Sequence, residues 1–422
     1  MTRRFDVLVV GAGPAGLAAA QAAATHGMHV GVVDDNPLAG GQIWRGGPQR
    51  QADARARTLW AQLSAMDNVS FIQQGRVLYA PAPGTLLVQT PDAALTLHYG
   101  RLILATGARE LLLPFPGWTL PGVTGAGGLQ ALVKGGYPVA GKRVVVAGSG
   151  PLLLAVAATL RQASAQVVAI AEQAPLRRLA RFGAGLFATP SKLKQAMLLA
   201  RQLRGVPYHA NSYVVSAHGD AAEQSVRSVR SVRLRRGGKV ESIACDFLAC
   251  GFGLLPNVEL AQALGCALER DAVRVDDLQA TSVDGIYCAG EGSGIGGVDL
   301  ALAEGRIAGL AAAGKTSLAQ AAIEQRGRWR GFALSLARAF ALRPQLRALA
   351  DDDTIVCRCE DVTHGELRPH DGWRSAKLQT RCGMGPCQGR VCGAATAVLY
   401  GWRPDAVRVP IVPARAGSIA AG

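Results

Sequence analysis

The sequence predicts an α/β protein with two Rossmann-like dinucleotide-binding domains and a small helical domain that carries clustered cysteines. The α/β prediction depends on a pattern that begins at Phe5 and again at Gly141: a buried strand, a glycine-rich turn, an apolar helix and a second strand. This pattern is typical of dinucleotide binding. The third domain is predicted because five of the nine cysteines lie between Val356 and Gly393, which is typical of a metal site in a reducing compartment.

The composition limits the classes of function. With 422 residues, 49% of them hydrophobic and 18% charged, the chain is long enough for two or three globular domains. The net charge of +15 comes mostly from scattered arginines, and only 5% of the residues are aromatic, which argues against nucleic-acid binding. No apolar run approaches the length of a membrane span. The start "FDVLVV" continues directly into a glycine turn, so we expect a strand, not a cleaved signal, in a cytoplasmic protein.

The first repeat, "FDVLVVGAGPAGLAAAQAAATHGMHVGVVDDN", predicts a nucleotide site. Gly11 permits the sharp turn, Gly13 lets the backbone approach a pyrophosphate, and Gly16 lets the helix lie close to the sheet. The N-terminus of this helix presents a partial positive charge to the phosphates. Asp34, at the end of the second strand, is placed to accept hydrogen bonds from the adenosine ribose.

Three later segments, "GGQIWR", "LILATGARE" and "TSVDGIYCAGEGSGIGG", identify the expected nucleotide as FAD. They resemble the recurring segments of the two-dinucleotide-binding flavoproteins, which have the glutathione- and thioredoxin-reductase-like fold. The resemblance implies that Glu291, where that family usually has Asp, contacts the ribityl chain. "GGQIWR" and the region around "VVVAGSGP" lack cysteine, which excludes thiol–disulfide exchange. The predicted FAD contacts are Gly11, Gly13, Pro14, Ala15, Gly16, Asp34, Gly41, Gln42, Arg45, Val77, Ala105, Thr106, Gly107, Gly290 and Glu291.

The second repeat, "GKRVVVAGSGPLLLAVAATLRQASAQVVAIAEQ", is altered at one position. Gly148 and Gly150 are candidate contacts of a second nucleotide, NAD(P) or an adenine nucleotide, and Glu172 ends the second strand. The third glycine position is Leu153, which should push the helix from the strand or narrow the pocket. We therefore favour a vestigial or repurposed pocket over a working NAD(P)H site.

The C-terminal cysteines predict a metal site with more than one possible ligand set. Cys357 and Cys359 are separated by one residue, and a pair separated by four residues would complete a set of four. That pair is either Cys382 with Cys387 or Cys387 with Cys392. Either set suits an iron–sulfur cluster or a structural zinc ion.

Four segments carry a second resemblance: "GWTLPGVTGAGGLQALVKGG", "GSGPLLL", "DDTIVCRCEDV" and "GMGPCQGRVC". They resemble the α (A) subunits of heteromeric dye-linked dehydrogenases, a family that includes opine oxidase, hydrogen cyanide synthase and the proline and D-hydroxyproline dehydrogenases. The tail is similar to the bacterioferritin-associated-ferredoxin [2Fe–2S] domain. The resemblance implies the ligands Cys357, Cys359, Cys387 and Cys392, which leaves Cys382 spare. Cys392 also enters a predicted helix, whose N-terminal dipole stabilises a thiolate.

These resemblances imply an electron-transfer subunit of a dehydrogenase that oxidises the C–N bond of an amino acid, imino acid or opine. The expected hetero-oligomer contains an amino-acid-oxidase-like β subunit, with a small ferredoxin-like subunit as a further candidate. No catalytic residue is predicted, because no motif pairs a histidine with a carboxylate. Two alternatives stay open: a self-contained NAD(P)H-dependent reductase, and a non-enzymatic iron–sulfur regulator or scaffold. The predicted domains are the FAD domain (1–115 and 256–325), the second nucleotide domain (116–255), a helical linker (326–352) and the [2Fe–2S] domain (353–422).

Overall fold

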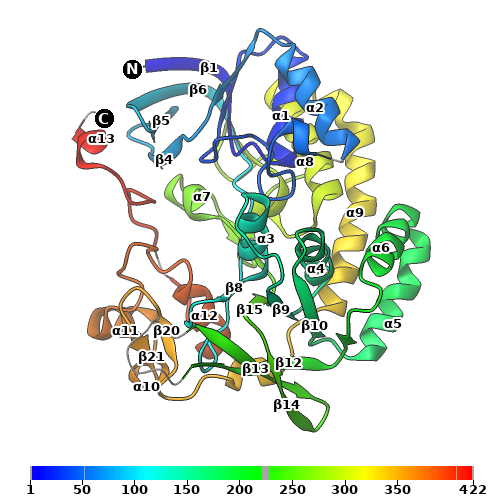
Figure 1. Cartoon of the computed structure of the whole chain (residues 1–422). Coiled ribbons are helices and arrows are strands. Elements are labelled where there is room, and N and C mark those ends of the chain that lie inside the picture. The colour runs from blue at the N-terminus through cyan, green and yellow to red at the C-terminus, as the bar shows by residue number, and fades with distance from the viewer. Residues whose placement is uncertain (1, 52, 221–227, 405, 421–422) are drawn as a thin grey trace. The chain divides into compact units, whose positions relative to one another are not determined.

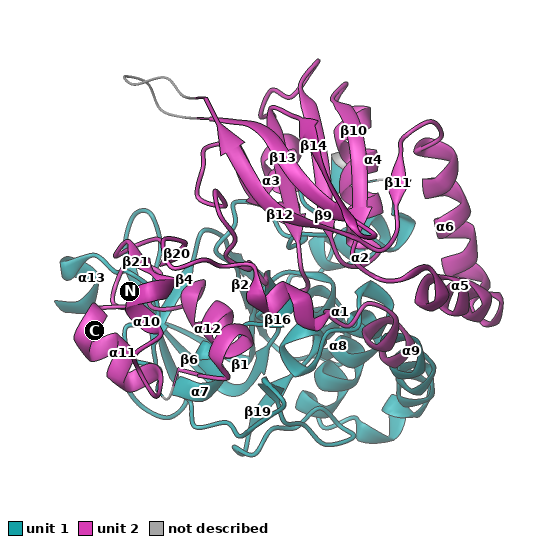
Figure 2. Cartoon of the chain, turned by 90° about the horizontal axis from the view of Figure 1, so that it is seen from below, with its two compact units in different colours: residues 1–109, 254–333, 406–422 teal, residues 110–253, 334–405 magenta. Residues whose placement is uncertain are grey.

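The computed structural model describes residues 2–51, 53–220, 228–404 and 406–420 (Figure 1). The chain divides into two compact units, which Figure 2 distinguishes by colour. Unit 1 comprises Met1–Arg109, Leu254–Ala333 and Ala406–Gly422, and unit 2 comprises Glu110–Gly253 and Leu334–Asp405. Among the described helices, none has both the length and the apolar character needed to cross a membrane.

Unit 1 contains a seven-stranded sheet with the order β3-β2-β1-β6-β5-β4, in which β19 also pairs with β6. Its strands are β1 (Thr2–Val10), β2 (Val30–Val33), β3 (Val69–Ile72), β4 (Arg76–Tyr79), β5 (Thr85–Gln89), β6 (Ala94–Leu104) and β19 (Ile286–Cys288). β3, β2, β1, β6 and β19 run parallel, whereas β4 and β5 pair antiparallel. The "VLVV" end of β1 is fully buried, as expected for the centre of a parallel sheet.

Small residues let two helices of unit 1 pack closely together (Figure 1). A Cβ on Gly305 of α8 would lie 2.1 Å from the Ala15 carbonyl oxygen of α1, and one on Gly309 would lie 2.3 Å from that of Ala19. The helices of this unit are α1 (Pro14–Ala24), α2 (Ala54–Ser64), α7 (Glu259–Ala263), α8 (Val298–Ala312) and α13 (Ala416–Ala420). Its shorter elements are η1 (Pro48–Arg50), β16 (Leu254–Pro256), β17 (Leu268–Glu269), β18 (Ala272–Val273), η3 (Gly290–Ser293) and η4 (Thr316–Ala319).

Unit 2 is built on a five-stranded parallel sheet with the order β11-β10-β9-β15-β8 and a three-stranded antiparallel sheet, β12-β13-β14. The strands are β8 (Val123–Gly125), β9 (Arg143–Gly148), β10 (Gln166–Glu172), β11 (Tyr208–His209), β12 (Ser212–Gly219), β13 (Val229–Arg236), β14 (Lys239–Ala244) and β15 (Phe247–Gly251). The helices that follow them are α3 (Ala126–Lys134), α4 (Leu152–Gln162), α5 (Leu176–Gly185), η2 (Leu186–Ala188) and α6 (Pro190–Gln202).

The cysteine-rich tail also lies in unit 2 and has its own small core around Trp373. Its elements are η5 (Pro344–Ala348), β20 (Ile355–Cys357), β21 (Val362–Thr363), α10 (His364–Leu367), α11 (Trp373–Thr380) and α12 (Cys392–Tyr400). Two of the points where the chain passes from one unit to the other lie within elements, one in β7 (Ala108–Glu110) and one in α9 (Gln320–Ala339).

The C-terminal part of the chain is divided between the two units. Residues 334–405 cluster with the middle of the chain, and residues 406–422 cluster with unit 1. Within unit 1, the Ile411 amide donates a hydrogen bond to the Leu78 carbonyl at 2.9 Å, and Arg415 binds the Gln89 side chain. These contacts give the last segment a place beside β4 and β5, which composition alone does not show.

Candidate functional site

The carboxyl ends of the parallel strands in unit 1 bring most of the predicted FAD contacts together. β1, β2, β6 and β19 end one or two residues before Gly11, Asp34, Ala105 and Gly290, respectively. Ligands bind at this edge in open α/β sheets, where the strand order changes direction. The fold therefore gathers these predicted contacts at one edge, although they come from distant parts of the chain.

The glycine turn has the geometry that the sequence predicts. Gly11 has a φ of +105°, and a Cβ there would lie 2.2 Å from the Ala105 carbonyl oxygen. A Cβ on Gly16 would lie 1.8 Å from the Gly11 oxygen, so the helix could not approach the turn. At Gly13 the nearest atom would be the Gly41 Cα, 4.0 Å away, which leaves this backbone open to a ligand at the start of α1.

Asp34 is held in place by the backbone around it. Its Oδ2 accepts a hydrogen bond from the Ala12 amide at 2.6 Å, and its Oδ1 accepts from the amide and side chain of Asn36, both at 2.8 Å. Arg45 donates to the Asn36 Oδ1 at 3.2 Å and to the Gln42 Oε1 at 3.0 Å. The structure thus joins the predicted residues Gln42 and Arg45 to the loop that follows Asp34.

The structure also defines the surroundings of three other predicted contacts, Thr106, Val77 and Glu291. The Thr106 hydroxyl donates to the Asn257 carbonyl at 2.7 Å. This hydrogen bond fixes the segment after β6, which also contains the predicted contacts Ala105 and Gly107. The Val77 side chain lies in the core of unit 1 and is 8% exposed, so its backbone is the part that could meet a cofactor. The Glu291 carboxylate accepts hydrogen bonds from the Gly296 and Gly297 amides at 3.1 and 2.8 Å. Glutamate has one methylene more than the aspartate that the resembled family usually has here, and this length lets the Glu291 carboxylate reach the amides of its own loop.

Sequence reasoning missed Glu304, a buried acid in α8. Its Oε2 accepts hydrogen bonds from the Gly290 amide at 3.0 Å and from the Ser293 hydroxyl at 3.1 Å, so it fixes the loop that carries Glu291. The side chain is 3% exposed, and burial raises its pKa from the ordinary 4.5 to about 7. The sequence does offer one signal for Glu304, which is an acidic residue within an Ala- and Gly-rich helix. Such a helix is expected to be buried, and a buried acid needs a polar partner.

We expect the pH dependence of stability to report the ionisation of Glu304. Between about pH 4.5 and 7 the folded protein keeps a proton on Glu304 that the unfolded chain has released, so rising pH reduces stability through this group. In Glu304→Gln, the loss of unfolding free energy between these two pH values should be smaller than in the wild type by on the order of 1–3 kcal/mol. The measurement is the free energy of unfolding in urea at both ends of the interval, with the exposed Glu269→Gln as control. Equal pH slopes for Glu304→Gln and the wild type would contradict the assignment.

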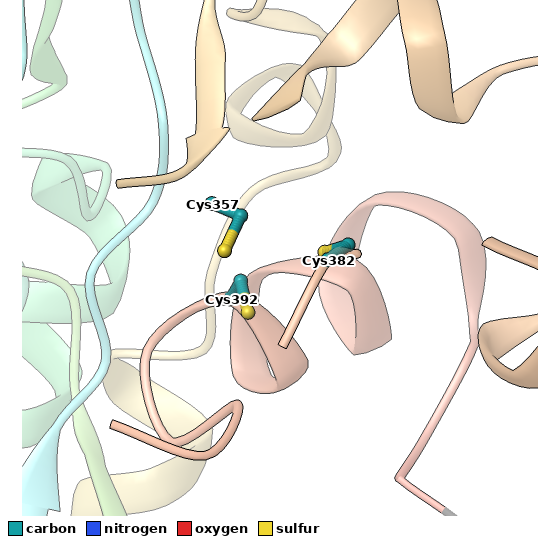
Figure 3. Close-up of side chains that lie close together, drawn as sticks. All are labelled: Cys357, Cys382 and Cys392. Carbon is teal, nitrogen blue, oxygen red and sulfur yellow. The ribbon is translucent and has the colours of Figure 1, made fainter. Parts of the chain in front are cut away.

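The five C-terminal cysteines come together in unit 2 in two groups. The Sγ atoms of Cys357, Cys382 and Cys392 all lie within 4.8 Å of one another, and all three side chains are buried (Figure 3). Cys359 and Cys387 form a second, more exposed pair, in which the Cys359 sulfur accepts a hydrogen bond from the Cys387 amide. The structure therefore places all five residues near one another, including the predicted spare.

One cavity in unit 2 lies beside these cysteines. A space of about 160 Å³ is lined by Cys357, Cys359, Cys387 and Cys392, whereas Cys382 lies outside its lining. The remaining walls are Leu112, Trp118, Arg358 and Val391. Four cysteines thus line one small, largely apolar space.

Local structure explains how these thiols reach the cavity. Cys357 ends β20, and Cys392 is the first residue of α12, as the sequence predicts. The pKa of Cys357 is lowered to about 2, mainly because its sulfur accepts hydrogen bonds from the Cys382 and Cys392 thiols. A Cβ on Gly385 would lie 2.2 Å from the Cys359 Cβ, so only glycine allows the loop to approach Cys359 this closely.

Known proteins resemble this sequence over nearly its whole length. The A subunit of opine oxidase from Rhizobium meliloti (strain 1021) is 32% identical over 460 residues, which cover 99% of this chain and 98% of that protein. The HcnB subunit of hydrogen cyanide synthase from Pseudomonas aeruginosa is 32% identical over 418 residues, which cover 91% of this chain and 90% of that protein.

Two crystal structures share the fold. L-proline dehydrogenase from P. horikoshii aligns with a TM-score of 0.70 at 19% identity, covering 99% of this chain and 80% of that one. Thioredoxin reductase of Lactococcus lactis aligns with a TM-score of 0.54 at 20% identity, covering 74% of this chain and 99% of that one. These alignments confirm the predicted Rossmann-like flavoprotein fold for the nucleotide-binding part.

The family model described as pyridine nucleotide-disulphide oxidoreductase matches residues 5–325, which include both glycine turns. The predicted class of enzyme, an oxidoreductase, is therefore confirmed. Taken with the full-length relatives, this match shows that the chain belongs to the pyridine nucleotide-disulphide oxidoreductase family of flavoproteins.

Proposed function

We propose that this chain is the FAD- and [2Fe–2S]-containing electron-transfer subunit of a heteromeric dehydrogenase. The enzyme would oxidise the C–N bond of an amino acid, an imino acid or an opine. The observation that carries the proposal is the presence, on one chain, of a flavoprotein glycine turn in unit 1 and a cavity lined by four cysteines in unit 2. The names of the full-length relatives, which are subunits of opine oxidase and hydrogen cyanide synthase, support the substrate class.

The residues at the edge of the unit 1 sheet fit FAD. The open backbone at Gly13 and the N-terminus of α1 suit a pyrophosphate, and Asp34 presents a fixed carboxylate to a ribose. Gly290 and Glu291 follow β19 at the same edge, where Glu304 fixes their loop. When bound, FAD supplies the exchange of electron pairs, and the chain's residues bind and orient it.

The residues around the cysteine cavity fit a [2Fe–2S] cluster. Four cysteines line the cavity from the end of β20, the turn that follows it, the loop before α12 and the first residue of α12. Leu112, Trp118 and Val391 contribute apolar walls to this cavity. Such a cluster would pass electrons singly. A structural zinc ion would also bind cysteine sulfur. An assay of iron, acid-labile sulfide and zinc in the purified chain decides between the cluster and the zinc ion.

Substrate oxidation is assigned to a second subunit. The relatives are named as subunits, and the sequence predicts no catalytic group in this chain. The structure does bring His364 to 3.7 Å from Asp352, a pair that no motif announces. Asp352 also binds Arg368 at 2.7 Å, and His364 stacks on Tyr400, so we interpret this pair as part of the local fold at the start of α10.

Co-expression tests this assignment. With an amino-acid-oxidase-like subunit, we expect a stable hetero-oligomer that reduces an artificial dye when given an amino acid, imino acid or opine. The isolated chain should oxidise none of these substrates and should not turn over NADH. NADH-to-dye turnover by the isolated chain at about 1 per second or faster would favour a self-contained reductase instead.

A further inference from the structure

We propose that the second nucleotide-binding fold, in unit 2, holds residues 340–343 of its own chain in the place of a dinucleotide. These residues connect the end of α9 to the start of η5. They meet the fold at its glycine turn and at the end of β10, which are the two places where a Rossmann fold holds a pyrophosphate and a ribose. The proposal goes beyond the function proposed above and does not depend on it.

A hydrogen-bond network ties this segment to the glycine turn. The Ser149 hydroxyl, in the middle of the turn, donates to the Phe340 carbonyl at 2.8 Å. The Gln173 side-chain amide donates to the Ser149 oxygen at 2.9 Å and to the Ala341 carbonyl at 3.2 Å. In return, the Arg343 amide donates to the Gln173 Oε1 at 3.1 Å. Gln173 is fully buried, so it acts as an internal clamp on the segment.

The side chains of the segment cover the turn. The Phe340 ring lies 3.9 Å from the point where a Cβ of Gly150 would be, and it packs edge-on against Phe182 at 5.2 Å between centroids. The Arg343 guanidinium binds the Asn211 side chain at 2.5 Å and lies 5.1 Å over the Tyr213 ring. A bare glycine at the position of Gly150 normally lets the backbone approach a pyrophosphate. Here an aromatic ring of the same chain lies against it.

Glu172 accepts the hydrogen bond of the Gly150 amide, a backbone donor that a bound phosphate would need. Its Oε2 accepts from the Gly150 amide at 2.7 Å, and its Oε1 accepts from the Ala174 amide at 2.8 Å. In unit 1, Asp34 instead binds the Ala12 amide, one position earlier in the turn. The longer side chain of Glu172 therefore reaches the amide of the second glycine and places a buried carboxylate where phosphate oxygens would have to lie.

Leu153 completes the difference between the two folds. This residue occupies the third glycine position and is 1% exposed, and its Cδ2 lies 3.3 Å from the point where a Cβ of Gly251 would be. The equivalent Gly16 in unit 1 lets its helix close on the turn. The residues at Gly148 and Gly150 thus do not fit a pyridine nucleotide. The second fold instead serves as a docking site for the segment that leads to the cysteines.

Nucleotide titration of the purified full-length chain, followed by hydrogen exchange, tests this proposal. NADH, NADPH and ATP should show no saturable binding to the wild type up to about 1 mM. Phe340→Ala with Arg343→Ala, and separately the milder Ser149→Ala, should speed amide exchange in residues 148–150 and 340–343 at least about tenfold. Leu334→Ala, an exposed residue of α9, is the control and should leave these rates unchanged.

Two results would overturn the proposal. One is saturable binding of any of these nucleotides to the wild type below about 100 μM, with slower exchange in the turn. The other is unchanged exchange in both Ser149→Ala and the double variant, because the segment would then not cover the turn. Neither readout depends on iron content or dye reduction, so failure here is distinct from failure of the proposed function.

Discussion

Cys392→Ser should yield a purified chain that has lost at least about nine-tenths of its iron and acid-labile sulfide, and Cys387→Ser should do the same. Both residues line the cysteine cavity, and Cys392 begins α12. Serine offers a harder oxygen donor in place of a soft thiolate, so it completes the ligand set poorly. Iron and sulfide assays on protein purified without oxygen measure the loss.

Cys382→Ser is the matched control. Cys382 is fully buried and lies close to Cys357 and Cys392, but it is outside the cavity lining. We expect this variant to keep its iron and to lose about 1–3 kcal/mol of stability from the buried hydroxyl. The ligand assignment fails if Cys382→Ser loses iron while Cys392→Ser retains it.

Gly16→Ala should lower the FAD content of the purified chain at least about tenfold. Its new Cβ would lie 1.8 Å from the Gly11 carbonyl oxygen, which belongs to the backbone of the turn and has no free space to move. α1 would have to shift away from the turn, and its N-terminus would no longer meet the pyrophosphate. Absorbance of FAD released by heat, relative to protein, measures the effect.

Gly327→Ala provides the comparison for this variant. Gly327 lies in α9, and a Cβ there meets no atom within 4 Å. Because alanine favours a helix over glycine by about 1 kcal/mol, this variant should be at least as stable as the wild type and should keep its FAD. Equal FAD content in Gly16→Ala and Gly327→Ala would show that the turn does not need this close approach.

The contacts that could be predicted are those set by short spacing. Gly11, Gly13 and Gly16 lie in one turn, and Asp34 follows the next strand, so a single local pattern specifies their geometry. The beginning of α12 at Cys392 was predictable for the same reason, because a small-residue helical stretch follows that cysteine.

The contacts that could not be predicted join distant parts of the chain. Ser149 binds Phe340 over a separation of 191 residues. No local spacing encodes this pair. Cys382 shows the same limit, since its spacing from Cys387 equals that of Cys387 from Cys392, and the sequence therefore leaves two ligand sets open.

Glu291 and Leu153 show how one side chain changes a motif. The resemblance to flavoproteins implies that Glu291 contacts the cofactor, and in the structure its carboxylate accepts hydrogen bonds from the Gly296 and Gly297 amides. The sequence also indicates that Leu153 disturbs the second turn, and this side chain is buried there. The segment that covers this turn comes from beyond α9, so the sequence pattern alone does not reveal it.

Cofactor stoichiometry tests most directly whether one chain carries both a flavin and an iron–sulfur cluster. The measurement is the content of FAD, iron, acid-labile sulfide and zinc per chain, in protein purified without oxygen. We expect about one FAD, two irons and two sulfides, with no zinc. About one zinc per chain without iron or sulfide would contradict the proposed function.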